Sequence, residues 1–184
     1  MKWYEAILAV VIVAALYRRL RQGEAEPPRQ RADSHEATLR AYRRAVEVAP
    51  DDAGAHRGMA QALYDLGRYD EALASFGRAA ELDPGSAPDI GRGMALLRLG
   101  RYGDALESLD RAAKSRPGDA NLHYSRGCAL AGIAGSQDAA GARERYGQAE
   151  GALREALRLD PHHSDAALAL EHVRKRIKMT ESVA

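Results

Sequence analysis

The chain is poor in cysteine and aromatic residues, and its charges nearly cancel. Cys128 is the only cysteine among 184 residues, so the sequence excludes both an intrachain disulfide and a zinc site built on a CxxC pair. Aromatic residues make up 5% of the chain, and the formal net charge is +1. Nucleic-acid binding usually draws on a basic field and on aromatic stacking, so this composition argues against a nucleic-acid partner.

Signals for catalysis and for metal binding are also missing. The glycines are scattered and form no nucleotide-binding loop. His162 and His163 are adjacent, but no cluster of carboxylates or cysteines stands beside them, and His56 and His123 occupy equivalent places in a repeat. We therefore expect no enzyme activity, no cofactor and no metal site.

What the chain does have is a regular series of prolines. Pro50, Pro84, Pro117 and Pro161 each close a similar phrase, and their spacings are 34, 33 and 44 residues. A fixed period in this range is typical of helical repeat arrays, which act as surfaces more often than as reaction sites.

The clearest repeat unit spans residues 53–86. In its first half, apolar or small residues recur at spacings of three and four, which places them on one helical face. Gly67 then suits a helix C-cap. The second half repeats the pattern up to Pro84, which cannot continue a helix. The unit therefore predicts a helix, a tight turn, a second helix and a stop. The apolar positions are Met59, Ala60, Leu63 and Leu66, then Tyr69, Ala72, Leu73, Phe76, Ala79 and Leu82.

This unit resembles a tetratricopeptide repeat, whose second helix carries Ala-x3-Phe and ends at a proline. The resemblance covers about residues 34–161 and implies an all-α solenoid of about three and a half repeats. We expect a capping helix over Asp165–Met179, a solenoid domain over 34–179 and a tail over 180–184. The matching residues are Ala72, Phe76 and Pro84; Ala105, Leu109 and Pro117; Ala149, Leu153 and Pro161; and, for the half-repeat, Thr38, Tyr42 and Pro50. The family's tryptophan position holds His56, Asp89 and His123 instead.

The last proline interval contains about ten extra residues, which precede Tyr146. One interpretation is that the second helix starts early, near Gln137 with Ser136 as its N-cap, and projects two or three turns beyond its neighbours. The other is a flexible loop over 135–145, which a solenoid tolerates at little cost.

The N-terminus differs from the rest of the chain. Ala6–Leu16 is apolar without interruption, with aromatic residues on both flanks and an arginine cluster after it. This pattern favours a transmembrane helix over 1–21 that contacts the membrane through residues 3–20, followed by a linker over 22–33. The arginine asymmetry then predicts a single-pass membrane protein with its repeats facing the cytoplasm. A cleaved signal peptide and a helix buried in a larger assembly are the alternatives.

The resemblance also implies that the first helices line a concave groove, able to hold an extended peptide or a partner helix. The alternative is that Met94 and Leu97 only pack against neighbouring helices. We therefore expect a membrane-anchored scaffold or adaptor that binds proteins, or alternatively a structural or assembly subunit of a membrane complex. Some family members clamp chaperone C-termini with paired asparagines, but Gln61 and Gly91 stand in those places here. The candidate groove residues are Arg57, Gln61, Tyr64, Ile90, Met94, Leu97, Asn121, Tyr124 and Cys128.

Overall fold

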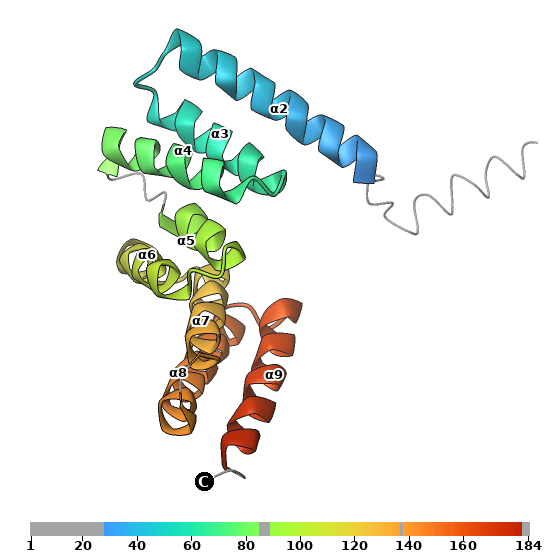
Figure 1. Cartoon of the computed structure of the whole chain (residues 1–184), viewed down its shortest axis with the longest axis vertical. Helices are drawn as coiled ribbons and strands as arrows, with labels where there is room; N and C mark the ends of the chain where they lie inside the picture. Colours follow the sequence, from blue (N-terminus) through green and yellow to red (C-terminus); the bar gives the residue numbers. More distant parts are fainter. Residues whose placement is uncertain (1–27, 85–88, 137, 182–184) are drawn as a thin grey trace, which may run out of the picture.

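The computed structural model describes residues 28–84, 89–136 and 138–181. This part of the chain is all-α and forms eight helices, stacked in sequence order from α2 at one end to α8 and α9 at the other (Figure 1). The helices are α2 (Pro28–Val48), α3 (Ala53–Asp65), α4 (Tyr69–Leu82), α5 (Asp89–Arg98), α6 (Tyr102–Ser115), α7 (Ala120–Ala134), α8 (Ala139–Leu159) and α9 (Ser164–Glu181).

The helices pair as the repeats predict. Each helix packs on the next one in sequence, and the first helices of successive repeats, α3, α5 and α7, also pack on one another and then on α9. Among the described helices, the second helices α4, α6 and α8 do not make such contacts with one another. Consequently α3, α5, α7 and α9 form one continuous face of the solenoid.

Local sequence explains where these helices begin and end. The Asp52 side chain caps α3 by accepting from the backbone amide of Gly54 at 2.7 Å. Gly67 and Gly100 follow α3 and α5 with φ of 75° and 73°, a left-handed conformation that favours glycine. The turn after α3 is closed by a 2.9 Å bond from the Arg68 amide to the Leu63 carbonyl.

The core is made largely of alanine and leucine, with Phe76 as its largest side chain in the first full repeat. Phe76 is 3% exposed, which confirms its predicted burial. Its ring lies directly on α5: a Cβ built on Gly91 would come within 2.4 Å of Phe76 Cζ. Tyr42 lies on Gly58 of α3 in the same way. In these two repeats an aromatic ring of the second helix thus packs on a glycine of the following first helix.

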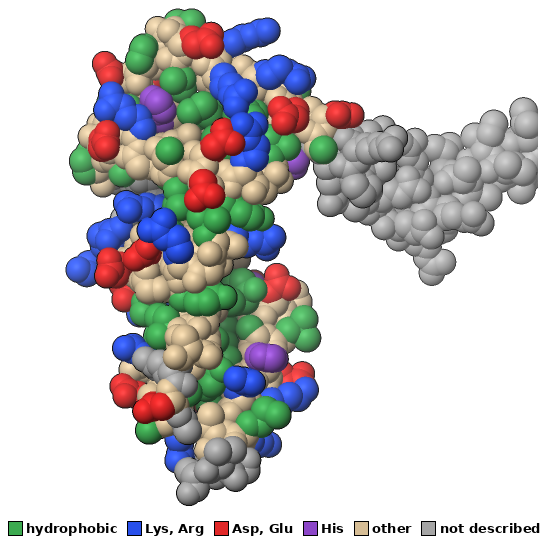
Figure 2. Space-filling model, in the orientation of Figure 1, with side chains coloured by type: hydrophobic (Ala, Val, Ile, Leu, Met, Phe, Trp, Pro, Cys, Tyr) green, Lys and Arg blue, Asp and Glu red, His purple; other side chains and the backbone are tan. Residues whose placement is uncertain are grey.

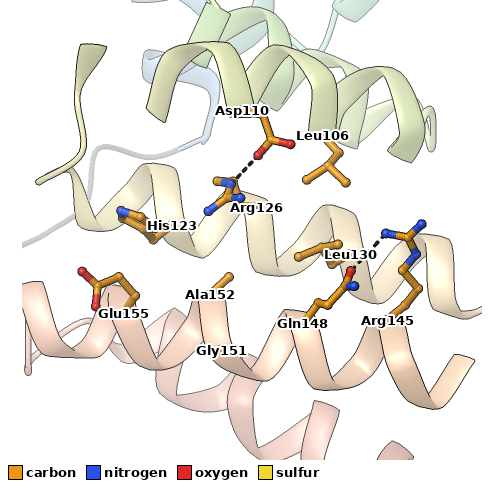
Figure 3. A pocket seen from close by; sticks show the side chains of 10 residues that line it. All are labelled: Leu106, Asp110, His123, Arg126, Leu130, Arg145, Gln148, Gly151, Ala152 and Glu155. Atoms are coloured by element: carbon orange, nitrogen blue, oxygen red, sulfur yellow. Dashed lines mark hydrogen bonds and ion pairs between the residues drawn. The ribbon is translucent and has the colours of Figure 1, made fainter. Parts of the chain in front are cut away.

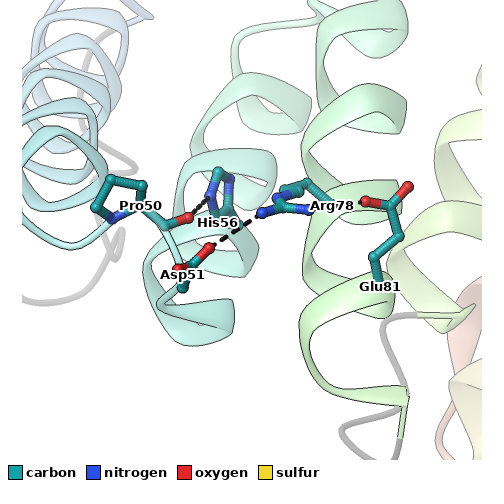
Figure 4. Close-up of polar contacts among 5 residues, drawn as sticks. All are labelled: Pro50, Asp51, His56, Arg78 and Glu81. Atoms are coloured by element: carbon teal, nitrogen blue, oxygen red, sulfur yellow. Dashed lines mark hydrogen bonds and ion pairs between the residues drawn. The ribbon is translucent and has the colours of Figure 1, made fainter.

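The histidines at the family's tryptophan position hold the turns between repeats. His56 Nε2 is 2.9 Å from the Pro50 carbonyl oxygen (Figure 4). His123 Nε2 is 2.8 Å from the Pro117 carbonyl oxygen. Beside the first of these turns, Arg78 donates to Asp51 at 3.1 Å (Figure 4). A directional hydrogen bond therefore replaces the apolar contact that a tryptophan would make there.

Most of the extra residues that precede Tyr146 in the last proline interval lie in a helix. Helix α8 starts at Ala139, and the Asp138 side chain caps it by accepting from the Gly141 amide at 2.9 Å. The helical interpretation is confirmed, although the cap is Asp138 rather than Ser136. Helix α8 has 21 residues against 14 in α4 and α6, which is about two extra turns.

The segment expected to be a linker ends earlier than predicted. Helix α2 begins at Pro28, so residues 28–33 are helical. Proline suits the first position of a helix, because the amide it lacks would have no intrahelical partner there. The capping helix α9 extends from Ser164 to Glu181, close to its expected bounds.

The predicted transmembrane helix over 1–21, with residues 3–20 in the membrane, lies outside the described residues. In the part of the chain that the structure describes, no helix has both the length and the apolar character needed to cross a bilayer. The two longest helices, α2 and α8, carry charged residues along their whole length. This finding contradicts the predicted localisation as a single-pass membrane protein with cytoplasmic repeats.

Candidate functional site

All nine residues that the sequence singled out lie on the first helices of the repeats. None of them belongs to the fully buried core: Arg57, Gln61 and Asn121 are exposed, and the other six are half-buried. Three come from each of the helices α3, α5 and α7. Arg57, Ile90 and Tyr124 share one repeat position, Gln61, Met94 and Cys128 share a second, and Tyr64 and Leu97 share a third, whereas Asn121 matches none of these.

A cavity of about 410 Å³ lies in this face, between α5, α7 and α9. Of the predicted residues, it brings together Leu97 and Cys128. Figure 2 shows hydrophobic side chains gathered where α9 lies against α7 and α8. The complete lining is Leu97, Tyr102, Gly127, Cys128, Ala131, Gly132, Leu153, Ala169, His172 and Val173.

Sequence reasoning missed the contribution of α9 to this cavity. Ala169 and His172 come from α9, which was interpreted only as a cap. The pattern that could have identified them is that α9 follows Pro161 just as α7 follows Pro117, so it occupies the place of a further first helix.

The cavity is open because a glycine interrupts a series of tyrosine–arginine contacts. Tyr69 accepts a 3.0 Å hydrogen bond from Arg98 Nε, and Tyr146 accepts one of 3.1 Å from Arg176 Nε. In both pairs the guanidinium also lies over the ring, at 5.4 Å and 5.7 Å from its centroid.

Between these two pairs, the equivalent contact joins Tyr102 to Gly132 instead of to an arginine. A Cβ at Gly132 would lie 2.4 Å from the Tyr102 ring, so the ring rests directly on the backbone of α7. Both residues line the cavity. The missing arginine side chain therefore leaves the space that its counterparts fill in the neighbouring repeats.

Tyr124 and Cys128 form the polar part of the groove floor. Burial raises the pKa of Tyr124 to about 12, with the neighbouring Cys128 as the next cause. Burial also raises the pKa of the Cys128 thiol, which a hydrogen bond with Tyr124 partly offsets. A raised pKa keeps the thiol protonated near neutral pH, and this does not favour Cys128 as a nucleophile.

The aromatic rings of this face interact along the groove. The ring of Tyr124 packs on His163 at a centroid distance of 5.0 Å, and Tyr64 packs on Tyr69 at 5.4 Å. Burial raises the pKa of Tyr64, and the positive charge of Arg98 opposes this rise. Tyr64, Arg98 and Tyr69 therefore connect the polar N-terminal part of the face to its apolar middle.

The exposed polar candidates stand apart from the cavity. Gln61 donates to Asp65 at 2.9 Å on its own helix, and neither Arg57 nor Asn121 lines the cavity. Across residues 28–84, 89–136 and 138–181, no group of three or more histidine, cysteine, aspartate or glutamate side chains could hold a metal ion.

With this geometry, the sequence match identifies the class of protein. The tetratricopeptide repeat model matches residues 30–87 and 90–142, which is more than half of the chain, and the chain therefore belongs to that family. It is a family of protein-interaction scaffolds rather than of enzymes. The comparison with curated proteins gave no match.

Solved structures share the fold at low sequence identity. MamA from residue 41 to its end, from Desulfovibrio magneticus RS-1, aligns with a TM-score of 0.68 at 24% identity, over 95% of this chain and 89% of that one. The Arabidopsis OM64 TPR domain gives 0.60 at 22% identity, over 67% and 94%. The second TPR domain of human RPAP3, in complex with the HSP70 peptide SGPTIEEVD, gives 0.56 at 18% identity, over 65% and 92%.

Proposed function

We propose that this chain is a scaffold that binds a partner protein, holding an extended peptide or a single helix of that partner in the groove formed by α3, α5, α7 and α9. The observation that carries the proposal is the cavity of about 410 Å³ between Leu97, Cys128 and His172. A repeat array that only needed to be stable would gain from filling this space, as Arg98 and Arg176 do beside the other tyrosines.

The cavity suits one large apolar side chain of the partner. Its walls are mostly leucine, alanine, glycine and valine residues, together with the Tyr102 ring, and the Cys128 thiol and the His172 ring add polar groups. Burying a leucine or phenylalanine side chain in such a site contributes about 1.5–3 kcal/mol, and a few central anchors of this kind usually dominate a protein interface.

The polar residues at the N-terminal end of the groove would fix the orientation of the bound segment. Arg57 and Gln61 are exposed on α3, whereas Ile90 and Met94 on α5 are half-buried. A segment with its anchor in the cavity and a polar or acidic end toward α3 matches this arrangement.

A structural neighbour that binds a peptide supports peptide binding by this chain, but it does not support binding of the same peptide sequence. The second TPR domain of human RPAP3 is in complex with the HSP70 peptide SGPTIEEVD. Members of the family that clamp chaperone C-termini rely on paired asparagines, and Gln61 and Gly91 stand at those positions here. We therefore do not extend the proposal to chaperone tails.

Site-specific photo-crosslinking tests the proposal. A benzophenone amino acid replaces Gln61 or His172, both exposed groove positions, and Glu107 on α6 serves as the control position. In cells that express the full chain, we expect the two groove positions to crosslink to the same partner protein and to adjacent parts of one segment. Crosslinks that arise only from position 107, or that join unrelated proteins at the two groove positions, would contradict the proposal.

A second candidate function is that of a structural subunit held by its end helices. Val48 at the end of α2 is 87% exposed, and Leu168 on α9 is 67% exposed. Contact with other subunits would remove these two apolar side chains from water. If Val48→Asp and Leu168→Asp abolish a stable complex that His172→Glu leaves intact, the subunit role explains the chain better than the groove does.

A further inference from the structure

A second pocket opens on the opposite side of α7, between α6 and α8 (Figure 3). Its volume is about 440 Å³. Leu106, Leu130 and Ala152 form an apolar floor, and polar side chains surround it. We call it the convex pocket; it shares no lining residue with the groove cavity. Its polar rim consists of Asp110, His123, Arg126, Arg145, Gln148 and Glu155, with Gly151 between the last two.

The rim contains an arginine whose usual partner has been replaced. In the first two repeats, the arginine before the second helix pairs with a carboxylate three residues later: Arg68 with Glu71 and Arg101 with Asp104, both at 2.6 Å. The equivalent pair in the third repeat is Arg145 with Gln148, where the guanidinium donates to the amide oxygen at 3.0 Å (Figure 3).

The other charges of the convex pocket are already compensated. Asp110 pairs with Arg126 at 2.7 Å, and Glu155 pairs with Arg158 at 2.7 Å. The nearby carboxylate of Glu144 accepts from Gln148 at 3.1 Å. Among the described residues, Arg145 is thus the rim charge that has an amide, and no carboxylate, as its partner.

The first two pocket residues that follow Gln148 on α8 are small. The positions that hold Ala74 and Ser75 in α4, and Glu107 and Ser108 in α6, hold Gly151 and Ala152 in α8. A Cβ on Gly151 would meet nothing within 4 Å, so the opening there is real space. Two departures from the repeat pattern, an amide for a carboxylate at position 148 and an alanine for a serine at position 152, therefore occur together around one pocket.

We propose that the convex pocket binds an acidic segment of a protein partner, with a carboxylate paired to Arg145 and an adjacent large aliphatic side chain on the floor of Leu106, Leu130 and Ala152. The incoming carboxylate takes the place that Glu71 and Asp104 hold in the other repeats. Arginine pairs with carboxylates through parallel hydrogen bonds, which gives the contact both strength and a fixed geometry. The proposal does not depend on occupation of the groove, because the two sites lie on opposite sides of α7.

Peptide display on the full chain tests this proposal with a defined probe. A random 12-residue phage library is selected on the wild-type chain and depleted on Arg145→Gln, and the surviving peptides are measured by fluorescence anisotropy. We expect these peptides to share an aspartate or glutamate near a leucine, isoleucine or methionine. Their affinity should fall roughly tenfold or more on Arg145→Gln, because a charge-assisted contact is lost.

Three further variants separate the loss of this ion pair from a general effect on folding. Gln148→Glu restores the internal ion pair of the other repeats without removing any contact from the core, and it should weaken the same peptides by competing for Arg145. Arg101→Gln makes the matched charge change in the second repeat and should leave their affinity unchanged. His172→Glu, in the groove cavity, should also leave it unchanged, which distinguishes this site from the proposed groove.

The outcomes that would overturn the proposal are equally defined. The proposal is wrong if the selection yields no peptide whose affinity falls on Arg145→Gln. It is also wrong if the peptides whose affinity falls contain no aspartate or glutamate. If the peptides bind Gln148→Glu as tightly as wild type, the peptide carboxylate does not compete with an internal carboxylate for Arg145. This result also refutes the proposal.

Discussion

The contact between Phe76 and Gly91 provides the sharpest test of how successive repeats pack. A methyl group on Gly91 would lie 2.4, 2.6 and 3.0 Å from three atoms of the Phe76 ring, far inside normal contact. Because Phe76 is 3% exposed, its ring has little room to move away. We expect Gly91→Ala to lower the free energy of unfolding by about 1–3 kcal/mol, the usual cost of overpacking a core.

Gly77 is the matched control, since it also lies inside a helix but its Cβ would meet nothing within 4 Å. Gly77→Ala should raise stability by up to about 1 kcal/mol, because alanine is the better helix former. The two variants should thus differ by about 1–4 kcal/mol. In a chain of this size that difference corresponds to roughly 2–16 °C in Tm.

Urea titrations followed by circular dichroism give the free energies, and thermal scans give the Tm values. The double variant Phe76→Leu with Gly91→Ser copies the residues that Leu109 and Ser125 place at the same repeat positions, and it should recover most of the loss. If Gly91→Ala is as stable as Gly77→Ala, the ring does not lie on Gly91 and the repeat-to-repeat packing described above is wrong.

Three further predictions concern the turns and the groove floor. His123→Ala removes the bond to the Pro117 carbonyl and should cost about 1 kcal/mol in urea titrations, whereas the exposed His162→Ala should cost almost nothing; equal losses would refute the turn-holding role. Gly67→Ala forces a side chain into φ of 75° and should cost about 1–2 kcal/mol, against no loss for Gly103→Ala, whose Cβ meets open space. Cys128 has a raised pKa in the folded chain, so at pH 8 it should react with a disulfide reagent more slowly than free cysteine does. As the pH rises, the unfolded chain loses its Cys128 proton at a lower pH than the folded chain does. The stability linked to this thiol is therefore fully present below the unfolded pKa and is lost as the pH rises through the folded pKa. Labelling of the native chain at pH 8 as fast as that of free cysteine would contradict the burial of the thiol.

The repeat architecture was predictable because it depends on residues whose effect is local. Pro84 and Pro117 stop helices wherever they stand, and the apolar spacing around Phe76 defines a helical face without knowledge of the neighbours. Even the early start of α8 was predictable, because helix-forming residues follow a residue that can cap a helix. Only the structure shows that this cap is Asp138 and not Ser136.

The sites were harder to predict, because they arise from what is missing at a repeat position. Gly132 leaves a cavity only because Tyr102 has no arginine to meet there, and Gln148 matters only because Arg145 reaches it in place of a carboxylate. A single sequence displays both residues, but their consequences appear only when the repeats are compared in space. The membrane localisation failed for a different reason: it relied on residues 1–21, and the described helices offer nothing that spans a bilayer.

The alanine-rich core has a thermal consequence. More than half of the buried apolar residues in the described part of the chain are alanines, and hydrogen bonds from His56 and His123 stand where an indole ring would bury more carbon surface. The heat capacity change of unfolding grows with the apolar area exposed, so we expect it to be small for a chain of this length. A small heat capacity change flattens the curve of stability against temperature, and this scaffold should therefore weaken little on cooling.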